Sequence, residues 1–201
     1  MGISRHHVII SGTGRAGTTF LVQLLTSLGL ETGFSNPYEN IYPQANAGME
    51  KDLRDPNAPY IVKSPWICDY IGDVLKEGDV VIDHAIIPIR ELYAAAESRR
   101  RISSDDPLGH TPNIVPGGIW DAENPQDQEK VLAVKLYQLL DALIEHEVPV
   151  TFLKFPRFVN DPVYLYRKLW FLFQNINYKE FLSFHSLVFK PQLIHTFERK
   201  T

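Results

Sequence analysis

The sequence of 201 residues has little that would tie it to a membrane or to an oxidising compartment. Its single cysteine, Cys68, excludes an internal disulfide, and the start MGISRHH, with only a short apolar run after it, is not a signal peptide. A membrane-spanning helix needs about 20 apolar residues, and charge or proline interrupts every candidate run. We therefore expect a cytoplasmic protein without a membrane span.

An excess of positive charge is also missing. The 20 lysines and arginines are outnumbered by 24 acidic residues, and the net charge is −4. Such a chain has no general attraction for nucleic acid or for an anionic membrane, so any bound anion must occupy a local pocket. Because 44% of the residues are hydrophobic, the chain can form one globular core, and we expect a single domain over residues 1–201.

Strand and helix patterns alternate along the chain. Short apolar runs predict strands at residues 8–10, 60–63, 80–89 and 148–152. Helical spacing of apolar residues predicts helices at residues 18–28, 91–101 and 127–147, and again beyond residue 162. The irregular, Pro- and Gly-rich stretch at residues 102–126 is expected to fold over a site. The alternation predicts an α/β fold, a three-layer sandwich with a central parallel sheet of the P-loop nucleotide-binding type.

The stretch SGTGRAGTTF, residues 11–20, joins the first predicted strand to the first predicted helix. Backbone N–H groups at a helix N-terminus, approached by glycines without a Cβ, can hold a phosphate group. The loop of a nucleoside triphosphatase reads GxxxxGK[ST], but Thr18 stands here at the lysine position. Arg15 is the only charged residue of the loop. We therefore expect an anion of lower charge than a triphosphate, bound without a metal.

Three motifs together resemble one known family. Arg-Ala-Gly-Thr-Thr at residues 15–19 matches the [KR]-[SAT]-G-[ST]-[ST] loop of the sulfotransferases that use 3′-phosphoadenosine 5′-phosphosulfate (PAPS). HAIIPIRELYAAAES places Arg90 at the end of a strand and Ser98 eight residues later, the spacing of that family's 3′-phosphate element. YIVKSP supplies Lys63, which matches the family's lysine at the end of an intervening strand. The resemblance covers residues 8–101 and continues only loosely around residues 151–172.

The resemblance implies a PAPS-dependent sulfotransferase, which would transfer a sulfuryl group to a hydroxyl or amine and release 3′,5′-adenosine diphosphate. It implies that Arg15 and Lys63 contact the 5′-phosphate and the transferred group, and that Arg90 and Ser98 bind the 3′-phosphate. Arg99, Arg100 and Arg101 are instead interpreted as a solvated face, with assistance to the 3′-phosphate by one of them as the alternative. The cofactor-binding residues implied by the resemblance are Arg15, Ala16, Gly17, Thr18, Thr19, Phe20, Arg90 and Ser98.

The acceptor group needs a general base. The cytosolic branch of the family uses a histidine two positions after the strand lysine, and Pro65 occupies that position here. The chain is therefore more similar to bacterial and heparan-type relatives, which use a glutamate after the first helix. That similarity makes Glu39, in NPYENIY, the predicted base, with Glu31 and His110 as alternatives.

The C-terminal segment has two interpretations. The FERKT segment places Arg199 and Lys200 where that family has basic residues that also touch the 3′-phosphate, although a frayed terminus gives the same pattern. A small-molecule kinase with a degenerate loop, and a nucleotide-binding module without a base, are the other two hypotheses. The acceptor class is equally open between a small molecule such as a phenol, a glycan, a lipid and a peptide.

Overall fold

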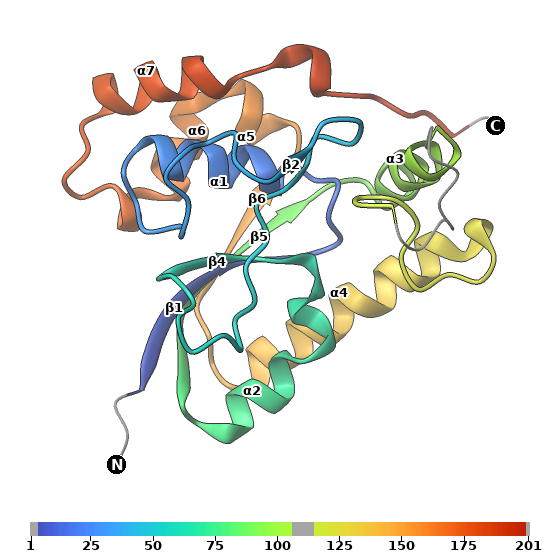
Figure 1. Ribbon diagram of the computed structural model, residues 1–201, viewed down its shortest axis with the longest axis horizontal. Helices are drawn as coiled ribbons and strands as arrows, with labels where there is room; N and C mark the ends of the chain where they lie inside the picture. The colour runs from blue at the N-terminus through green and yellow to red at the C-terminus, as the bar shows by residue number, and fades with distance from the viewer. Residues whose placement is uncertain (1–3, 106–114, 200–201) are drawn as a thin grey trace.

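A parallel four-stranded sheet runs through the middle of the computed structural model, which describes residues 4–105 and 115–199 (Figure 1). The strands lie side by side in the order β4 (Ile61–Lys63), β1 (Arg5–Ile10), β5 (Val80–Ile89) and β6 (Val150–Lys154). Every neighbouring pair is parallel. The carboxyl ends of β1, β4 and β5 therefore meet at one edge of the sheet.

Helices cover both faces of this sheet. The first layer consists of α1 (Thr18–Ser27), α5 (Arg157–Asn160), α6 (Pro162–Lys168) and α7 (Tyr178–Val188). The second layer consists of the short helix η1 (Pro65–Asp69) with α2 (Ile71–Glu77), α3 (Leu92–Ser104) and α4 (Gln128–Glu145). Alternate residues of β1 face the two layers, because Val8 and Ile10 pack in the first core cluster and Ile9 packs in the second. The predicted three-layer α/β fold is confirmed.

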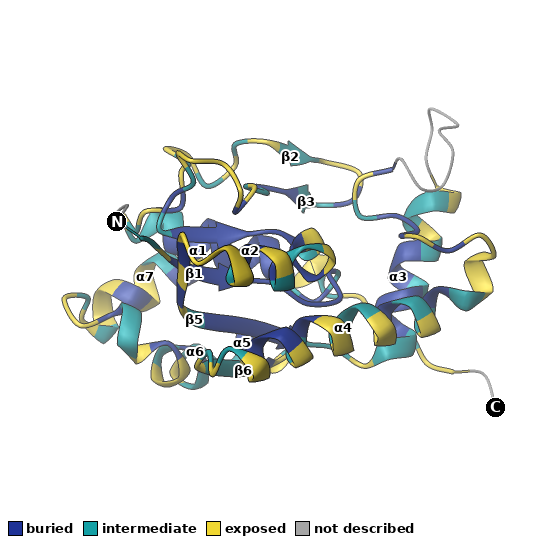
Figure 2. Ribbon diagram, turned by 90° about the horizontal axis from the view of Figure 1, so that it is seen from below, coloured by how far each residue is buried: buried dark blue, intermediate teal, exposed yellow. Residues whose placement is uncertain are grey.

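Two short strands form a hairpin that the sequence did not predict. β2 (Ile41–Tyr42) pairs antiparallel with β3 (Ala47–Gly48). Each strand has only two residues, too few for an alternating apolar pattern to show. Figure 2 shows the hairpin as a separate layer beside the buried central strands. Among the described residues, short 3-10 helices also form at η2 (Pro125–Asp127), η3 (Trp170–Leu172) and η4 (Pro191–Leu193).

Within residues 4–105 and 115–199, no helix is long and apolar enough to cross a membrane.

Cys68 is buried in η1, and its thiol is expected to be inert in the folded protein. Burial and the neighbouring Asp69 carboxylate raise the pKa of Cys68 to about 12. Because the thiolate is the reactive form, we expect an aromatic disulfide reagent at pH 8 to label the native thiol on the order of 100-fold more slowly than the urea-unfolded thiol. Similar labelling rates for the two states would contradict the burial of Cys68.

Candidate functional site

A cavity of about 310 Å³ opens at the carboxyl edge of the sheet. The loop after β1, the ends of β4 and β5, and the hairpin all contribute to its wall. Further contributions come from α3, from residues 115–120 and from the segment after α7. Segments distant in sequence therefore share one concave surface, the usual setting of a ligand site in α/β proteins.

The glycine loop lies at the floor of this cavity and leads directly into α1. Gly17 is the N-cap of α1 with a left-handed φ of 82°, and no side chain in the described part of the chain caps this helix. Thr18 and Thr19 begin the helix and line the cavity. The N–H groups of the first turn therefore remain available to an anion.

Gly17 tolerates no side chain, which gives a test of the loop conformation. A Cβ at Gly17 would lie 2.8 Å from Cζ of Phe158 and 3.1 Å from Cδ2 of Phe155. Gly17→Ala is therefore expected to lower the free energy of unfolding by about 2 kcal/mol, from the left-handed backbone and the clash together. Urea unfolding followed by circular dichroism measures this change.

Gly72 in α2 provides the matched control. A Cβ added to Gly72 would clash with nothing, because no atom outside its own turn lies within 4 Å. Gly72→Ala is therefore expected to raise the free energy of unfolding by about 0.5–1 kcal/mol. Equal effects of the two substitutions would contradict the described loop.

Arg15 connects the glycine loop to two other segments. Its Nε–H donates to Oγ of Ser98 on α3 at 3.0 Å, and an η N–H donates to the carbonyl of Ala45 in the hairpin turn at 2.6 Å. Burial and the nearby guanidinium of Arg90 lower the pKa of Arg15 to about 10. Within the part of the chain that the structure describes, this partly buried guanidinium donates to neutral acceptors, so a bound anion would be a better partner.

Arg90 reaches the same place from the end of β5. One η N–H donates to the carbonyl of Arg15 at 2.8 Å, and another donates to the carbonyl of His195 at 2.5 Å. The guanidinium lies 5.0 Å from the ring centroid of Phe155 and 5.5 Å from that of Phe197. Burial lowers the pKa of Arg90. The structure thus brings together Arg15, Arg90 and Ser98, the residues predicted to bind the two ends of one nucleotide.

Lys63 ends β4 and is almost fully buried, with 3% of its side chain exposed. Its Nζ donates to the carbonyl of Gly48 in the hairpin at 2.8 Å and forms an ion pair with Glu50. Burial lowers the pKa of Lys63, and the carboxylate of Glu50 opposes that shift. A lysine and a glutamate therefore face the cavity as a pair.

The cavity is basic although the chain is acidic. The charged side chains lining it within the described ranges are Arg15, Lys63, Arg90, Arg99 and Lys190, with one carboxylate, Glu50. Five basic groups against one acidic group make a site for an anion with more than one charge.

Comparison with known proteins identifies a shared fold but no family. No protein-family model matches the chain, and no curated protein matches its sequence. Among solved structures, the "Sulfotransferase Domain from the Curacin Biosynthetic Pathway" aligns with a TM-score of 0.51 and 15% identity, over 99% of this chain and 80% of that chain. The chain has the fold of that P-loop sulfotransferase domain. At this identity, the likeness is one of fold.

In this sulfotransferase fold, Arg99 lines the cavity and contacts the glycine loop, which we did not predict from the sequence. Its η N–H groups donate to the carbonyl of Thr13 in the glycine loop at 2.8 Å and to the carbonyl of Gly118 at 2.6 Å. The guanidinium lies 5.2 Å from the ring centroid of Trp120. Burial lowers the pKa of Arg99 to about 9, with a further contribution from Arg15. The expectation that Arg99 belongs to a solvated face is wrong.

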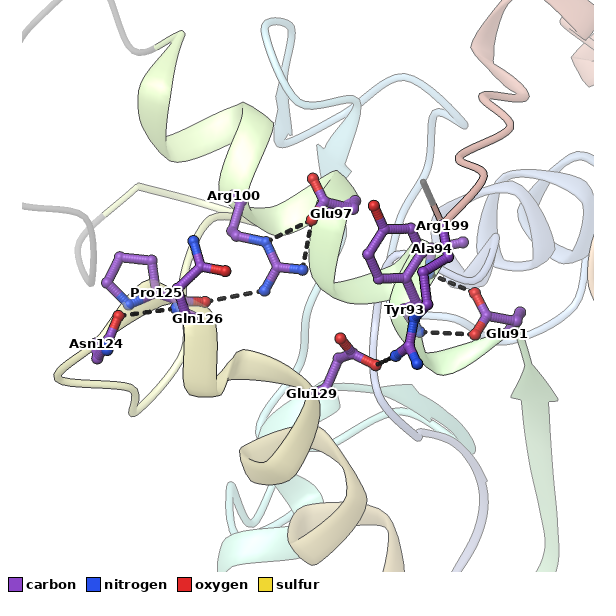
Figure 3. A network of polar contacts seen from close by, with 10 residues as sticks. All are labelled: Glu91, Tyr93, Ala94, Glu97, Arg100, Asn124, Pro125, Gln126, Glu129 and Arg199. Atoms are coloured by element: carbon purple, nitrogen blue, oxygen red, sulfur yellow. Dashed lines mark hydrogen bonds and ion pairs between the residues drawn. The ribbon is translucent and has the colours of Figure 1, made fainter. Parts of the chain in front are cut away.

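Helical spacing could have separated Arg99 from its two neighbours. Ala95, Arg99 and Ile102 share one face of α3, which turns toward the core and the cavity. Arg100 instead pairs with Glu97, as Figure 3 shows. Arg101 pairs with Asp105. These two arginines lie outside the residues that line the cavity.

The predicted base, Glu39, is not among the residues that line the cavity of the sulfotransferase fold. Its carboxylate accepts hydrogen bonds from the backbone N–H and the hydroxyl of Ser35, at 3.3 and 3.4 Å. Glu31 is exposed and does not line the cavity either. His110 lies outside the described residues. The carboxylate that does line the cavity is Glu50, which no sequence motif indicated.

Of the other residues implied to contact the nucleotide, Phe20 lines the cavity, whereas Ala16 and Arg199 do not. Phe20 is buried, lines the cavity and lies 5.4 Å from the ring centroid of His185. Ala16 is fully buried in the core cluster beneath the loop. Figure 3 shows Arg199 bonded to Glu129, at 2.8 Å. Arg199 also lies over the ring of Tyr93, 5.2 Å from its centroid. Lys200 lies outside the described residues.

Within the described ranges, no group of three or more His, Cys, Asp or Glu is placed to hold a metal ion.

Proposed function

We propose that the protein is a PAPS-dependent sulfotransferase, which transfers a sulfuryl group from PAPS to a hydroxyl or amine of an acceptor. The observation that carries this proposal is the meeting of the glycine loop, Lys63 and the Arg90–Ser98 element around one basic cavity. The fold shared with a sulfotransferase domain supports it.

The residues around the cavity fit a nucleotide that carries anionic groups at both ends. We assign the 5′-phosphosulfate to the N-terminus of α1, with Arg15 and Lys63 beside it. We assign the 3′-phosphate to Arg90 and Ser98, and the adenine to the neighbourhood of Phe20. A guanidinium binds phosphate oxygens through two parallel N–H groups, so a phosphate would be a stronger partner for Arg90 than the two carbonyls it contacts.

When bound, PAPS supplies the activated sulfuryl group. Sulfuryl transfer resembles phosphoryl transfer, in which the protein mainly positions the reactants in line and stabilises the charge on the bridging oxygen. We assign the stabilisation of that charge to Arg15 and Lys63, because Lys63 is buried and Arg15 is partly buried, so water screens their charges less than at the surface.

We propose Glu50 as the general base in preference to Glu39. Glu50 lines the cavity beside Lys63, whereas the contacts of Glu39 are with Ser35. A base must lie within hydrogen-bond reach of the proton that it removes. Lys63 orients the Glu50 carboxylate through their ion pair, so the two residues act as a unit on the acceptor side.

A transfer assay tests the proposed reaction. The purified protein is incubated with sulfur-labelled PAPS and a panel of phenols, sugars, lipid alcohols and amines. We expect labelled product on at least one acceptor, with one 3′,5′-adenosine diphosphate released per product. Binding of PAPS without transfer to any acceptor would favour the non-catalytic module. Phosphate transfer from ATP with magnesium would favour the kinase.

A further inference from the structure

The order of the strands divides the cavity into a side for the nucleotide and a side for the acceptor, an inference that rests on the proposed function. Lys63 ends β4 and Arg90 follows β5, and β1 with its glycine loop lies between those strands. A nucleotide held by the loop and by Arg90 therefore extends toward β5. In-line displacement requires the acceptor to approach opposite the leaving oxygen. The acceptor consequently lies on the β4 side, next to Lys63 and Glu50.

Three neutral segments enclose the β4 side. They are the hairpin turn from Pro43, the start of η1 at Pro65 and Trp66, and residues 115–120. The hairpin and the third segment meet, because a Cβ added to Gly117 would lie 3.2 Å from that of Ala47. Apart from the turn's Gln44 and Asn46, these segments present apolar or glycine residues to the cavity.

The charged groups on this side already have partners. Lys63 pairs with Glu50 and donates to a hairpin carbonyl. Arg99 is buried, and its hydrogen bonds to the carbonyls of Thr13 and Gly118 hold the glycine loop against residues 115–120. An acidic acceptor would have to break the ion pair of Lys63 or place its negative charge beside the Glu50 carboxylate.

Trp66 adds an aromatic surface at the rim. The exposed fraction of Trp66 is 50%, although the residue lines the cavity. Its backbone N–H donates to Oγ of Ser64 at 3.2 Å, and Pro65 begins the same turn. The backbone that carries the indole is therefore held in place before any ligand arrives. A fixed, exposed indole beside a cavity gives a flat apolar ligand a surface to pack on.

We propose that the acceptor is a small, uncharged and largely apolar alcohol or phenol, which packs on Trp66 and directs its hydroxyl to Glu50. In the transfer, the bond from sulfur to the 5′-phosphate oxygen breaks and a bond from sulfur to the acceptor oxygen forms. The hydroxyl proton passes to the Glu50 carboxylate, and 3′,5′-adenosine diphosphate leaves with the electron pair of the broken bond.

Binding to the protein saturated with 3′,5′-adenosine diphosphate tests this assignment. Isothermal titration calorimetry compares 4-propylphenol with a galacturonic acid trimer, an uncharged probe against an anionic one. We expect the phenol to bind and the trimer not to bind. Trp66→Ala is expected to weaken phenol binding by about 10-fold, and Trp66→Phe to restore most of the affinity.

Trp170→Ala is the matched control, because Trp170 is equally exposed, at 52%, and does not line the cavity. It is expected to leave phenol binding unchanged, and all three variants should keep the affinity for 3′,5′-adenosine diphosphate. Binding of the trimer instead of the phenol, or unchanged phenol binding in Trp66→Ala, would overturn the acceptor assignment alone. A wild-type protein that does not bind 3′,5′-adenosine diphosphate would overturn the proposed function with it.

Discussion

Replacing Arg90 with alanine is expected to weaken the binding of 3′,5′-adenosine diphosphate about 100-fold, while 5′-AMP binding changes by less than about threefold. The difference arises because only the first nucleotide carries the 3′-phosphate that we assign to Arg90. Burial lowers the pKa of this guanidinium, so a charged partner there gains more than it would at the surface. Isothermal titration calorimetry with the two nucleotides measures both affinities.

Two further variants keep this test independent of folding. Arg90 also donates to the carbonyls of Arg15 and His195, so its loss removes structural contacts. Arg90→Lys keeps the charge without the planar fork and is expected to bind 3′,5′-adenosine diphosphate with intermediate affinity. Arg157→Ala removes an exposed arginine paired with Asp161 and should change neither affinity. An equal loss for both nucleotides in Arg90→Ala would refute the 3′-phosphate assignment.

Replacing Glu50 with glutamine is expected to slow sulfuryl transfer by about 100- to 10,000-fold, the range for removal of a general base. Glutamine retains the shape and one acceptor oxygen, so the contact with Lys63 is weakened but not replaced by a void. We therefore expect the affinity for 3′,5′-adenosine diphosphate to change by less than about threefold. A single-turnover rate at saturating PAPS and acceptor isolates the transfer step.

Glu39→Gln is the paired variant, because Glu39 is the base that the sequence resemblance predicted. Its carboxylate contacts Ser35 and does not line the cavity, so the transfer rate should fall by less than about threefold. A slow Glu39→Gln with an active Glu50→Gln would return the role of base to Glu39.

The bounds of a strand could be predicted from the sequence where its apolar pattern lies within that strand alone. β5 coincides with the predicted residues 80–89, because its apolar run is bounded by Gly78 and Asp79 before it and by Arg90 after it. β1 begins at Arg5, three residues before the predicted start at Val8. Arg5 and His6 are polar, and the pairing that makes them a strand, with Val80 and Val81, comes from β5.

The motifs that line the cavity could be recognised in the sequence for the same reason, whereas the contacts between distant residues could not. The loop at residues 15–19 and the spacing of Arg90 and Ser98 are local motifs, and the structure places all of them near one cavity. Arg99 bonds to Thr13, 86 positions away, and to Gly118, 19 positions away. No local pattern specifies those partners.

Nucleotide-dependent stabilisation of the wild-type protein tests the central claim most directly. Thermal unfolding is followed during titration with 3′,5′-adenosine diphosphate and, separately, with ATP and magnesium. If both ends of one nucleotide are held in this cavity, the first ligand stabilises saturably and without magnesium, by about 2.7 kcal/mol at a concentration of 100 Kd. Stabilisation by ATP with magnesium, and none by 3′,5′-adenosine diphosphate, would contradict the account.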